Sequence, residues 1–180
     1  MAQFYSQERY QYNIKIMKRY YFAYGMNTHI HEMTRRCPRA INLGRCTLTD
    51  FELKFRYHAD IDRVVGSEME GVLWDITEEC ERALDRLEGY PYYYDKIEVV
   101  VIPDNPDSNN YNNTRIIAMA YIMNTKGQEE APSINYEDCL IEGYTANGLD
   151  VEKLTTKIDS LIINLCINKT VFSEYYWIIR

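Results

Sequence analysis

Apolar and polar positions alternate over much of the chain with the period of two that is typical of β-strands. The segment Pro103 to Thr114 is nearly all Pro, Asp, Asn and Ser, so we expect a hairpin with a long polar loop there. A second polar stretch, 58–69, is also expected to be a loop. The strands expected from the pattern are 20–25, 40–49, 51–57, 70–76, 93–102 and 115–124.

Helices are expected where a capping residue precedes an amphipathic segment. Asn27 or Thr28 is expected to cap a helix that Cys37-Pro38 ends. Thr77 caps a second helix, whose first turn is rich in Glu, and which ends at Glu88. The first half of the chain therefore combines strands with two short helices.

Two further helices are expected near the C-terminus, and both should pack on the sheet. Ser133 caps a helix that runs toward Gly143, and Asp150 caps another. One apolar stripe marks the second of these helices: Val151, Leu154, Ile158, Leu161 and Leu165. Strands that come in runs, with helices between some of them and at the end, favour an α+β fold.

The length of 180 residues fits one domain, for which we expect residues 20–180, preceded by a flexible N-terminal extension over 1–19. The formal charge of −7 argues against nucleic acid as a partner. No apolar run approaches the roughly 18 residues that a membrane span needs, and the first residues do not resemble a secretory signal. We therefore expect a cytoplasmic protein that does not enter a membrane.

The cysteines are odd in number and form no Cys-x-x-Cys pair, which argues against a disulfide framework and against a zinc site. His29 and His31 are expected to be surface residues rather than metal ligands, since helical neighbours two apart point in different directions. No metal and no other cofactor is expected. Most of the cysteines are expected to be reduced core thiols: Cys37, Cys46, Cys80, Cys139 and Cys166.

Glu88 is the first candidate for catalysis, because it ends a short amphipathic segment and is followed at once by Gly89. The last carbonyls of a helix carry partial negative charge, which pushes a neighbouring carboxyl group toward its protonated form. A Glu in that position can act as a base near neutral pH. An exposed glutamate at a helix end is nevertheless common, so the position alone does not decide between a base and a surface residue.

The second candidate is the segment Tyr21-Phe22-Ala23-Tyr24-Gly25-Met26-Asn27, which has the pattern of a strand, a glycine turn and a helix start. Such a turn exposes backbone N–H groups that can hold an anion or a polarised carbonyl. The 17 tyrosines of the chain are mostly structural, although hydroxyls inside a pocket can orient a polar substrate. The apolar end, Tyr175 to Ile179, is expected to pack on the domain or on a second subunit, so a homodimer is possible.

The order of these motifs resembles the gamma-glutamylcyclotransferase family, whose members carry a Tyr-Gly-Ser-Asn type loop after the first strand and a Glu-Gly after the middle helix. Here Tyr24-Gly25-Met26-Asn27 and Glu88-Gly89 stand in those places. Three further segments resemble the family: 70–74, 94–101 and 132–149. Met26 stands where the family usually has Ser. This exchange leaves the backbone N–H groups of the loop able to bind substrate, but it removes any hydrogen bond that the Ser hydroxyl would make.

The resemblance implies a small mixed β-barrel flanked by helices, with the glycine loop and Glu88 facing one pocket. It implies an enzyme that cyclises a gamma-glutamyl amide to 5-oxoproline and releases a free amine, with no metal and no cofactor. Glu88 is expected to transfer the protons. The residues expected to bind the small gamma-glutamyl substrate are Tyr21, Phe22, Ala23, Tyr24, Gly25, Met26, Asn27, Tyr94, Tyr121 and Tyr136.

Two other functions fit the same sequence. One is a binding or interaction protein that keeps the fold without catalysis, since a fold does not fix a function. The other is a cyclotransferase that acts on a gamma-glutamyl group of a larger molecule. The size of the leaving amine depends on the segments 58–69 and 103–114, whose conformation the sequence pattern does not specify.

Overall fold

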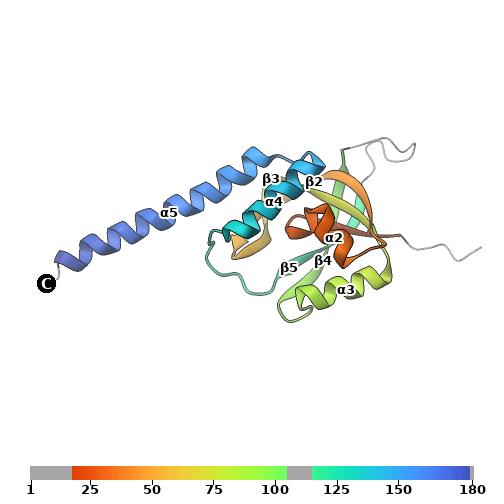
Figure 1. Ribbon diagram of the computed structural model, residues 1–180, viewed down its shortest axis with the longest axis horizontal. Helices are drawn as coiled ribbons and strands as arrows, with labels where there is room; N and C mark the ends of the chain where they lie inside the picture. Colours follow the sequence, from red (N-terminus) through yellow and green to blue (C-terminus); the bar gives the residue numbers. More distant parts are fainter. Residues whose placement is uncertain (1–17, 105–114, 179–180) are drawn as a thin grey trace, which may run out of the picture.

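The computed structural model describes residues 18–104 and 115–178, with side chains in the last helix given up to Leu165 and at Ile167. The described residues form a closed five-stranded barrel in the order β1-β3-β2-β4-β5 (Figure 1). β1 is parallel to β5, and the other neighbouring pairs are antiparallel. The strands are β1 (Arg19–Ala23), β2 (Ile41–Arg56), β3 (His58–Ile76), β4 (Tyr94–Pro103) and β5 (Ile116–Met123). This mixed barrel with its flanking helices confirms the predicted α+β fold.

In β4 and the first part of β5 the buried residues alternate with more exposed ones, as in a pleated strand with one buried face, whereas β1 is buried at three successive residues, Tyr21 to Ala23. β4 and β5 pair as the predicted hairpin, although residues 105–114 of the expected loop lie outside the described residues. β1 begins at Arg19, so this residue belongs to the barrel. The largest strand side chains with almost no solvent exposure are Phe22, Leu48, Phe55, Ile61, Leu73, Val72 and Val101.

The prediction of a polar loop over 58–69 is wrong, because these residues are the first part of the long strand β3. β2 and β3 form one extended antiparallel hairpin that reaches from Arg56↔His58 to Ile41↔Asp75. The two strands expected over 40–49 and 51–57 are a single strand, with an irregular register at Asp50, whose φ is +62°. Several polar side chains are paired across this hairpin, Arg56 with Asp60 and Asp62 and Glu52 with Ser67, and Asp60 also binds Lys126 outside it.

The helices cover the barrel and begin as predicted at three of their caps. Thr77 accepts a hydrogen bond from the N–H of Cys80, Ser133 from that of Tyr136, and Asp150 from that of Lys153. In Figure 1, α3 lies along one side of the barrel and α5 leads away from it to the C-terminus. The helical elements are η1 (Met26–Thr28), α2 (Ile30–Arg36), α3 (Glu78–Glu88), α4 (Ile134–Asn147) and α5 (Val151–Ile178).

The start of α2 differs from the prediction. Asn27 and Thr28 belong to the 3-10 turn η1 and are buried, and His29 is the capping residue, whose Nδ1 accepts from the N–H of Glu32. His29 is therefore only partly exposed, and its Nε2 lies 2.9 Å from Glu142 Oε2. At its other end α2 stops at Arg36, before Cys37-Pro38, as predicted. The 3-10 turn takes up the residues that were expected to open the helix.

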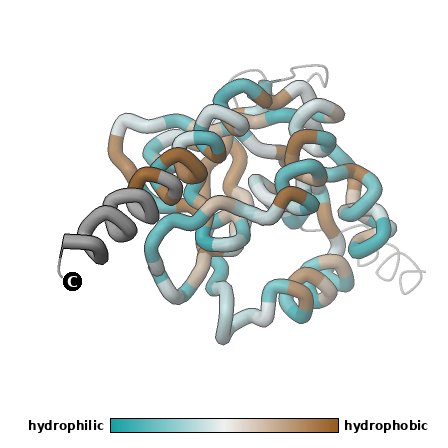
Figure 2. The backbone as a smooth tube through the Cα atoms, turned by 60° about the vertical axis from the view of Figure 1, so that its left-hand side comes forward, coloured by the Kyte–Doolittle hydropathy of each residue, from teal (hydrophilic) through white to brown (hydrophobic). Residues whose placement is uncertain are grey.

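Helix α5 packs on the barrel through its first turns. Leu154, Ile158 and Leu161 are buried as predicted, whereas Leu165 is 40% exposed, so the stripe loses contact with the barrel before this residue. Figure 2 shows brown, hydrophobic stretches of α5 next to its grey part, and the described residues here include the exposed Ile162, Ile163 and Ile167. The side chains of Tyr175 to Ile178, together with Ile179, lie outside the described residues. None of the helices within the described ranges has the length and apolar character of a membrane span.

The described cysteines are free thiols, and three of them lie in the core. Cys37, Cys46 and Cys80 are buried, and Cys139 is partly buried. Burial raises the pKa of the Cys37 thiol to about 12 and raises that of Cys46 still further. These thiols are therefore protonated at neutral pH and serve as small apolar core residues.

Candidate active site

A cavity of about 520 Å³ lies at one end of the barrel, between the strand ends, the turn η1, the C-terminus of α3 and the start of α4. Its volume is in the range of small-molecule sites. The cavity is lined by nine of the residues predicted to form the site: Tyr21, Tyr24, Gly25, Met26, Asn27, Glu88, Tyr94, Tyr121 and Tyr136. The fold thus brings together segments that lie more than a hundred residues apart in the sequence.

Phe22 and Ala23 are the two predicted site residues that do not line this cavity. Phe22 pairs with Leu73 and Ala23 with Val72 in the antiparallel ladder of β1 and β3, and both side chains are fully buried. Gly71 lies so close to Phe22 that an added Cβ would meet its ring at 2.5 Å. These two residues support the barrel wall behind the site.

Glu88 is the only acidic side chain that lines the cavity in the described part of the chain, and it is partly buried. Its Oε1 lies 3.3 Å from the Nδ2 of Asn27. Burial raises the pKa of Glu88 above its usual value of 4.5, while the charge of Arg36 and the hydrogen bond from Asn27 act in the opposite direction. The direction agrees with the prediction, but burial raises this pKa, whereas the prediction rested on the position at a helix end.

Gly89 ends α3 directly behind this carboxylate and adopts a left-handed conformation with φ of +65°. The chain then turns through Tyr90-Pro91, and the N–H groups of Tyr92 and Tyr93 both donate to the carbonyl of Gly89. A Cβ at Gly89 would also meet the ring of Tyr93 at 2.5 Å. A glycine is therefore favoured here for two reasons: it adopts the left-handed conformation that ends α3, and it leaves space for the ring of Tyr93 in the cavity wall.

Five phenols surround the carboxylate, and all of them stay protonated at neutral pH. Burial raises the pKa of each: to about 12 for Tyr136, and well above its usual range for Tyr21, Tyr24, Tyr94 and Tyr121. Negative charge on Glu88 acts in the same direction on all five. The phenols are therefore hydrogen-bond donors rather than bases.

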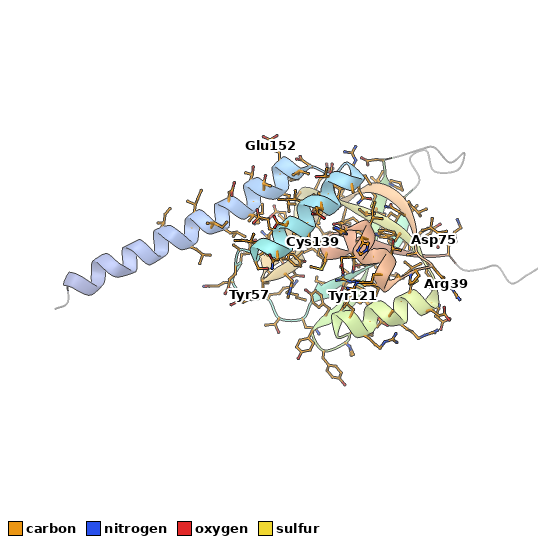
Figure 3. The ribbon with its side chains drawn as sticks, in the orientation of Figure 1. Arg39, Tyr57, Asp75, Tyr121, Cys139 and Glu152 are labelled. Atoms are coloured by element: carbon orange, nitrogen blue, oxygen red, sulfur yellow. The ribbon has the colours of Figure 1, made fainter. Side chains whose placement is uncertain are left out.

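Most of these hydroxyls already have a protein partner. Tyr121, labelled in Figure 3, donates to Asp85 Oδ1 of α3 over 2.7 Å, and Tyr24 donates to the carbonyl of Tyr121. The hydroxyl of Tyr136 accepts from the N–H of Ala59 over 3.1 Å. These bonds fix the rings of the cavity wall and connect β1, β3, β5, α3 and α4 around it.

Gly25 is needed in the loop because other groups approach it closely. A Cβ at this position would lie 3.1 Å from the hydroxyl of Tyr136 and 3.2 Å from the Cβ of Ala59. These two groups leave little space for a side chain at Gly25. A side chain here would fill the cavity between η1 and α4.

The structure adds cavity residues that the sequence analysis did not identify. The most polar is Arg36 at the end of α2, which donates from Nη1 to Asn27 Oδ1 over 2.6 Å. Arg36 lies nine residues from Asn27, a spacing that no local pattern marks as a contact. The other additional lining residues are His58, Ala59, Leu87, Tyr92, Tyr93, Met123 and Thr125.

The site combines one acid, one guanidinium and several neutral phenols. Within the described residues no group of three or more His, Cys, Asp or Glu side chains could hold a metal ion. A carboxylate with a raised pKa can accept and return a proton, and amide and phenol donors can bind a polar substrate. The arrangement therefore suits proton transfer to a small polar molecule.

Comparison with known proteins agrees with this geometry. A solved gamma-glutamyl cyclotransferase is 27% identical with a TM-score of 0.67, covering 80% of this chain and 88% of that protein. An uncharacterized protein from Homo sapiens gives the same values. YkqA from Bacillus subtilis shares the fold with a TM-score of 0.67 at 22% identity, covering 81% of this chain and 55% of its own.

No match was found among curated protein sequences. The family model "Gamma-glutamyl cyclotransferase, AIG2-like" matches residues 21–139, from β1 into the first turns of α4. This range includes the glycine loop, Glu88 and all the tyrosines predicted to contact substrate. The chain belongs to the gamma-glutamyl cyclotransferase, AIG2-like family.

Proposed function

We propose that the protein is a cyclotransferase that converts a gamma-glutamyl amide into 5-oxoproline and a free amine, with Glu88 transferring the protons. The observation that carries this proposal is the Glu88 carboxylate, which is partly buried in the cavity wall, has a raised pKa and faces the amide of Asn27. Membership of the family and the likeness to a solved gamma-glutamyl cyclotransferase support the choice of reaction.

The substrate supplies its own nucleophile in this reaction. Its α-amine attacks the γ-carbonyl, which forms the C–N bond of a five-membered ring, and the C–N bond to the leaving amine then breaks. The protein has to hold the substrate folded for ring closure, take a proton from the α-ammonium and deliver one to the leaving nitrogen. One carboxylate can perform both transfers in turn, and Glu88 is the acid of the cavity.

The loop opposite Glu88 is the proposed binding element for the gamma-glutamyl group. Backbone N–H groups of the turn at Tyr24 to Asn27 bind the polar atoms of the substrate and stabilise the oxyanion that develops on the γ-carbonyl. The phenols of Tyr94, Tyr121 and Tyr136 line the cavity on the other sides. Because their pKa values are raised, these phenols stay protonated and do not compete with Glu88 for protons.

The test is the release of 5-oxoproline from a panel of gamma-glutamyl amino acids and gamma-glutamyl amines. Glu88→Gln keeps the shape of the side chain and removes the base, so turnover should fall by at least 100-fold while the fold is retained. Glu78→Gln is the matched control, since Glu78 lies on the same helix, at its exposed N-terminal end, and pairs only with Arg82 at the surface.

The outcome separates catalysis from binding alone. If Glu88→Gln releases 5-oxoproline as fast as the wild type, Glu88 does not transfer the protons. A wild type that releases no 5-oxoproline from any member of the panel, but is stabilised against heat by one of them, would instead be a binding protein of the same fold.

A larger gamma-glutamyl compound is the second candidate substrate, and the openness of the cavity favours it. Tyr92 and Tyr93 line the cavity and are nevertheless 85% and 77% exposed. The amine portion of a bound gamma-glutamyl amide, which the reaction releases, can therefore extend into solvent there. Comparing kcat/KM for the gamma-glutamyl amide of methylamine with that of a lysine-containing peptide decides between the two sizes. A peptide derivative that is not turned over would exclude the larger class.

A further inference from the structure

We propose that Arg36 is a positioning residue for Glu88, acting through the side-chain amide of Asn27. The proposal rests on the proposed function for its effect on turnover, but not for its effect on the Glu88 carboxylate itself. It assigns a role to a cavity residue that neither the sequence motifs nor the family match single out.

The geometry joins three side chains from three elements into one line of hydrogen bonds. Arg36 Nη1 of α2 donates to Asn27 Oδ1 of η1 over 2.6 Å. Asn27 Nδ2 in turn faces Glu88 Oε1 of α3 at 3.3 Å and donates to the hydroxyl of Tyr21 over 2.9 Å. Asn27 is 4% exposed, so solvent offers its amide little competition.

This order of contacts fixes which end of the amide meets the carboxylate. A guanidinium is a donor only, so it can bind Asn27 through the oxygen and not through the nitrogen. The NH₂ group must then point toward Glu88 and Tyr21. Without Arg36, the amide of Asn27 can turn over and present its oxygen to the carboxylate, which repels it.

Arg36 itself is held in place from two sides. Its Nη2 lies 3.2 Å from Glu32 Oε2, one turn earlier in α2, and 3.0 Å from the Sδ of Met26. The guanidinium thus contacts both Met26 and Asn27 of the loop and also its own helix. Its side chain is only 14% exposed, so it is not a freely moving surface arginine.

The charge of Arg36 also acts on Glu88. Among the described residues that line the cavity, Arg36 is the only Lys or Arg, and it opposes the effect of burial on the pKa of Glu88. Removing its charge should raise that pKa further, because burial then acts with less opposition. The titratable and charged groups that line the cavity or contact its wall are Tyr21 of β1, Tyr24 directly after it, Arg36 of α2, His58 of β3, Asp85 of α3, Tyr92 and Tyr93 of the turn after α3, Tyr94 of β4, Tyr121 of β5 and Tyr136 of α4.

The experiment is a pH titration of the Glu88 side-chain carboxyl by ¹³C NMR, with the signal assigned by its loss in Glu88→Gln. Arg36→Gln should titrate at higher pH than the wild type, and Arg36→Lys, which keeps the charge, should titrate close to the wild type. Arg35→Gln is the matched control, because Arg35 pairs with the same Glu32 from an exposed position and should leave the titration unchanged.

Turnover provides the second readout. In Arg36→Gln, kcat/KM should fall by about 10- to 100-fold, and the acidic limb of its pH profile should move to higher pH. In Arg36→Lys, kcat/KM should also fall, because an ammonium lacks the planar fork that holds Asn27, but the acidic limb should stay in place.

Two results would overturn the proposal: a Glu88 carboxyl that titrates alike in Arg36→Gln and in the wild type, or an equal shift in Arg35→Gln. If Arg36→Gln does not fold, Arg36→Lys decides, and wild-type kcat/KM in that variant would exclude a positioning role. A wild type that releases no 5-oxoproline from any substrate of the panel contradicts the proposed function. The NMR titration of the Glu88 carboxyl in the Arg36 variants still tests the effect of Arg36 in that case.

Discussion

Replacing Gly143 with Ala tests whether the contact between α4 and the turn η1 holds the candidate site together. Gly143 is buried in α4, and a Cβ placed there would lie 2.5 Å from Thr28 Oγ1, 2.7 Å from His29 N and 2.9 Å from the carbonyl carbon of Thr28. Two of these three atoms belong to the backbone. The helix or the turn therefore has to move to admit a methyl group.

The size of the effect follows from two opposing contributions. Overpacking of a tight contact costs about 1–3 kcal/mol. Alanine regains about 1 kcal/mol of helix propensity relative to glycine. Because two of the three close atoms are backbone, the upper part of the overpacking range, about 2–3 kcal/mol, applies. We therefore expect the free energy of unfolding to fall by about 1–2 kcal/mol, which corresponds to a decrease in Tm of about 2–8 °C for a domain of this size.

The same movement should reduce activity. The turn η1 carries Asn27, and α4 carries Tyr136, so a shift between them displaces two sides of the cavity relative to each other. A displacement of about 1 Å can cost up to 100-fold in rate. We expect kcat/KM to fall by about tenfold or more, as measured by 5-oxoproline release.

Urea unfolding followed by circular dichroism measures the stability, and Gly127→Ala is the control. Nothing lies within 4 Å of a Cβ at Gly127, so this substitution should change the free energy of unfolding by less than about 0.5 kcal/mol. A Gly143→Ala protein that is at least as stable and as active as Gly127→Ala would refute the argument that close packing of α4 on η1 shapes the site.

Three further predictions concern the cavity. Because burial raises the pKa of Glu88 above 4.5, the ionised form costs stability, and this cost appears as the pH rises from about 4.5 through the pKa in the folded protein. Glu88→Gln should therefore become progressively more stable than the wild type over that range in urea unfolding at several pH values; equal pH dependence of the two proteins would contradict the pKa shift. Met26→Ser should enlarge the cavity and raise kcat/KM for bulky gamma-glutamyl amides relative to small ones by about fivefold, and an unchanged ratio across the substrate panel would show that this side chain does not limit substrate size. EDTA should leave turnover unchanged, since the proposed chemistry needs only a base and hydrogen-bond donors, and a loss that added Zn²⁺ or Mg²⁺ restores would contradict it.

Helix starts could be predicted from the sequence because they depend on contacts within one turn. Thr77, Ser133 and Asp150 each place a side-chain oxygen next to the N–H three residues later, so residue type and position suffice. His29 was missed as the cap of α2, because a 3-10 turn intervenes and an imidazole nitrogen acts as the acceptor.

The long β2–β3 hairpin could not be predicted, because its polar residues are satisfied by partners that are not adjacent in the sequence. Asp60 is fully buried, and it binds Arg56 of the neighbouring strand and Lys126, which follows β5. The N–H of Met123 also donates to it over 2.9 Å. A local pattern of acids and glycine is typical of a loop, and only the closed barrel supplies these partners.

The candidate site shows the same division between local and long-range information. Glu88 and the loop around Gly25 could be identified because each forms a short motif with a characteristic neighbour. Arg36 could not, since its contacts with Met26 and Asn27 exist only after α2 has folded back over the turn that precedes it. Phe22 was placed in the site by its position in the motif, although strand pairing buries it behind the cavity.

Residues beyond the family match hold the glycine loop in place. The family match ends at residue 139, inside α4, yet two hydrogen bonds of this helix with the loop come from residues further along it. Tyr144 donates from its hydroxyl to the carbonyl of Tyr24, and Asn147 Nδ2 donates to the carbonyl of Thr28 over 2.8 Å. These bonds occupy two loop carbonyls, one on each side of Met26 and Asn27. The backbone of the loop is thus fixed from α4 whichever side chain stands at Met26, and the contact with Arg36 then sets the direction of the Asn27 amide toward Glu88.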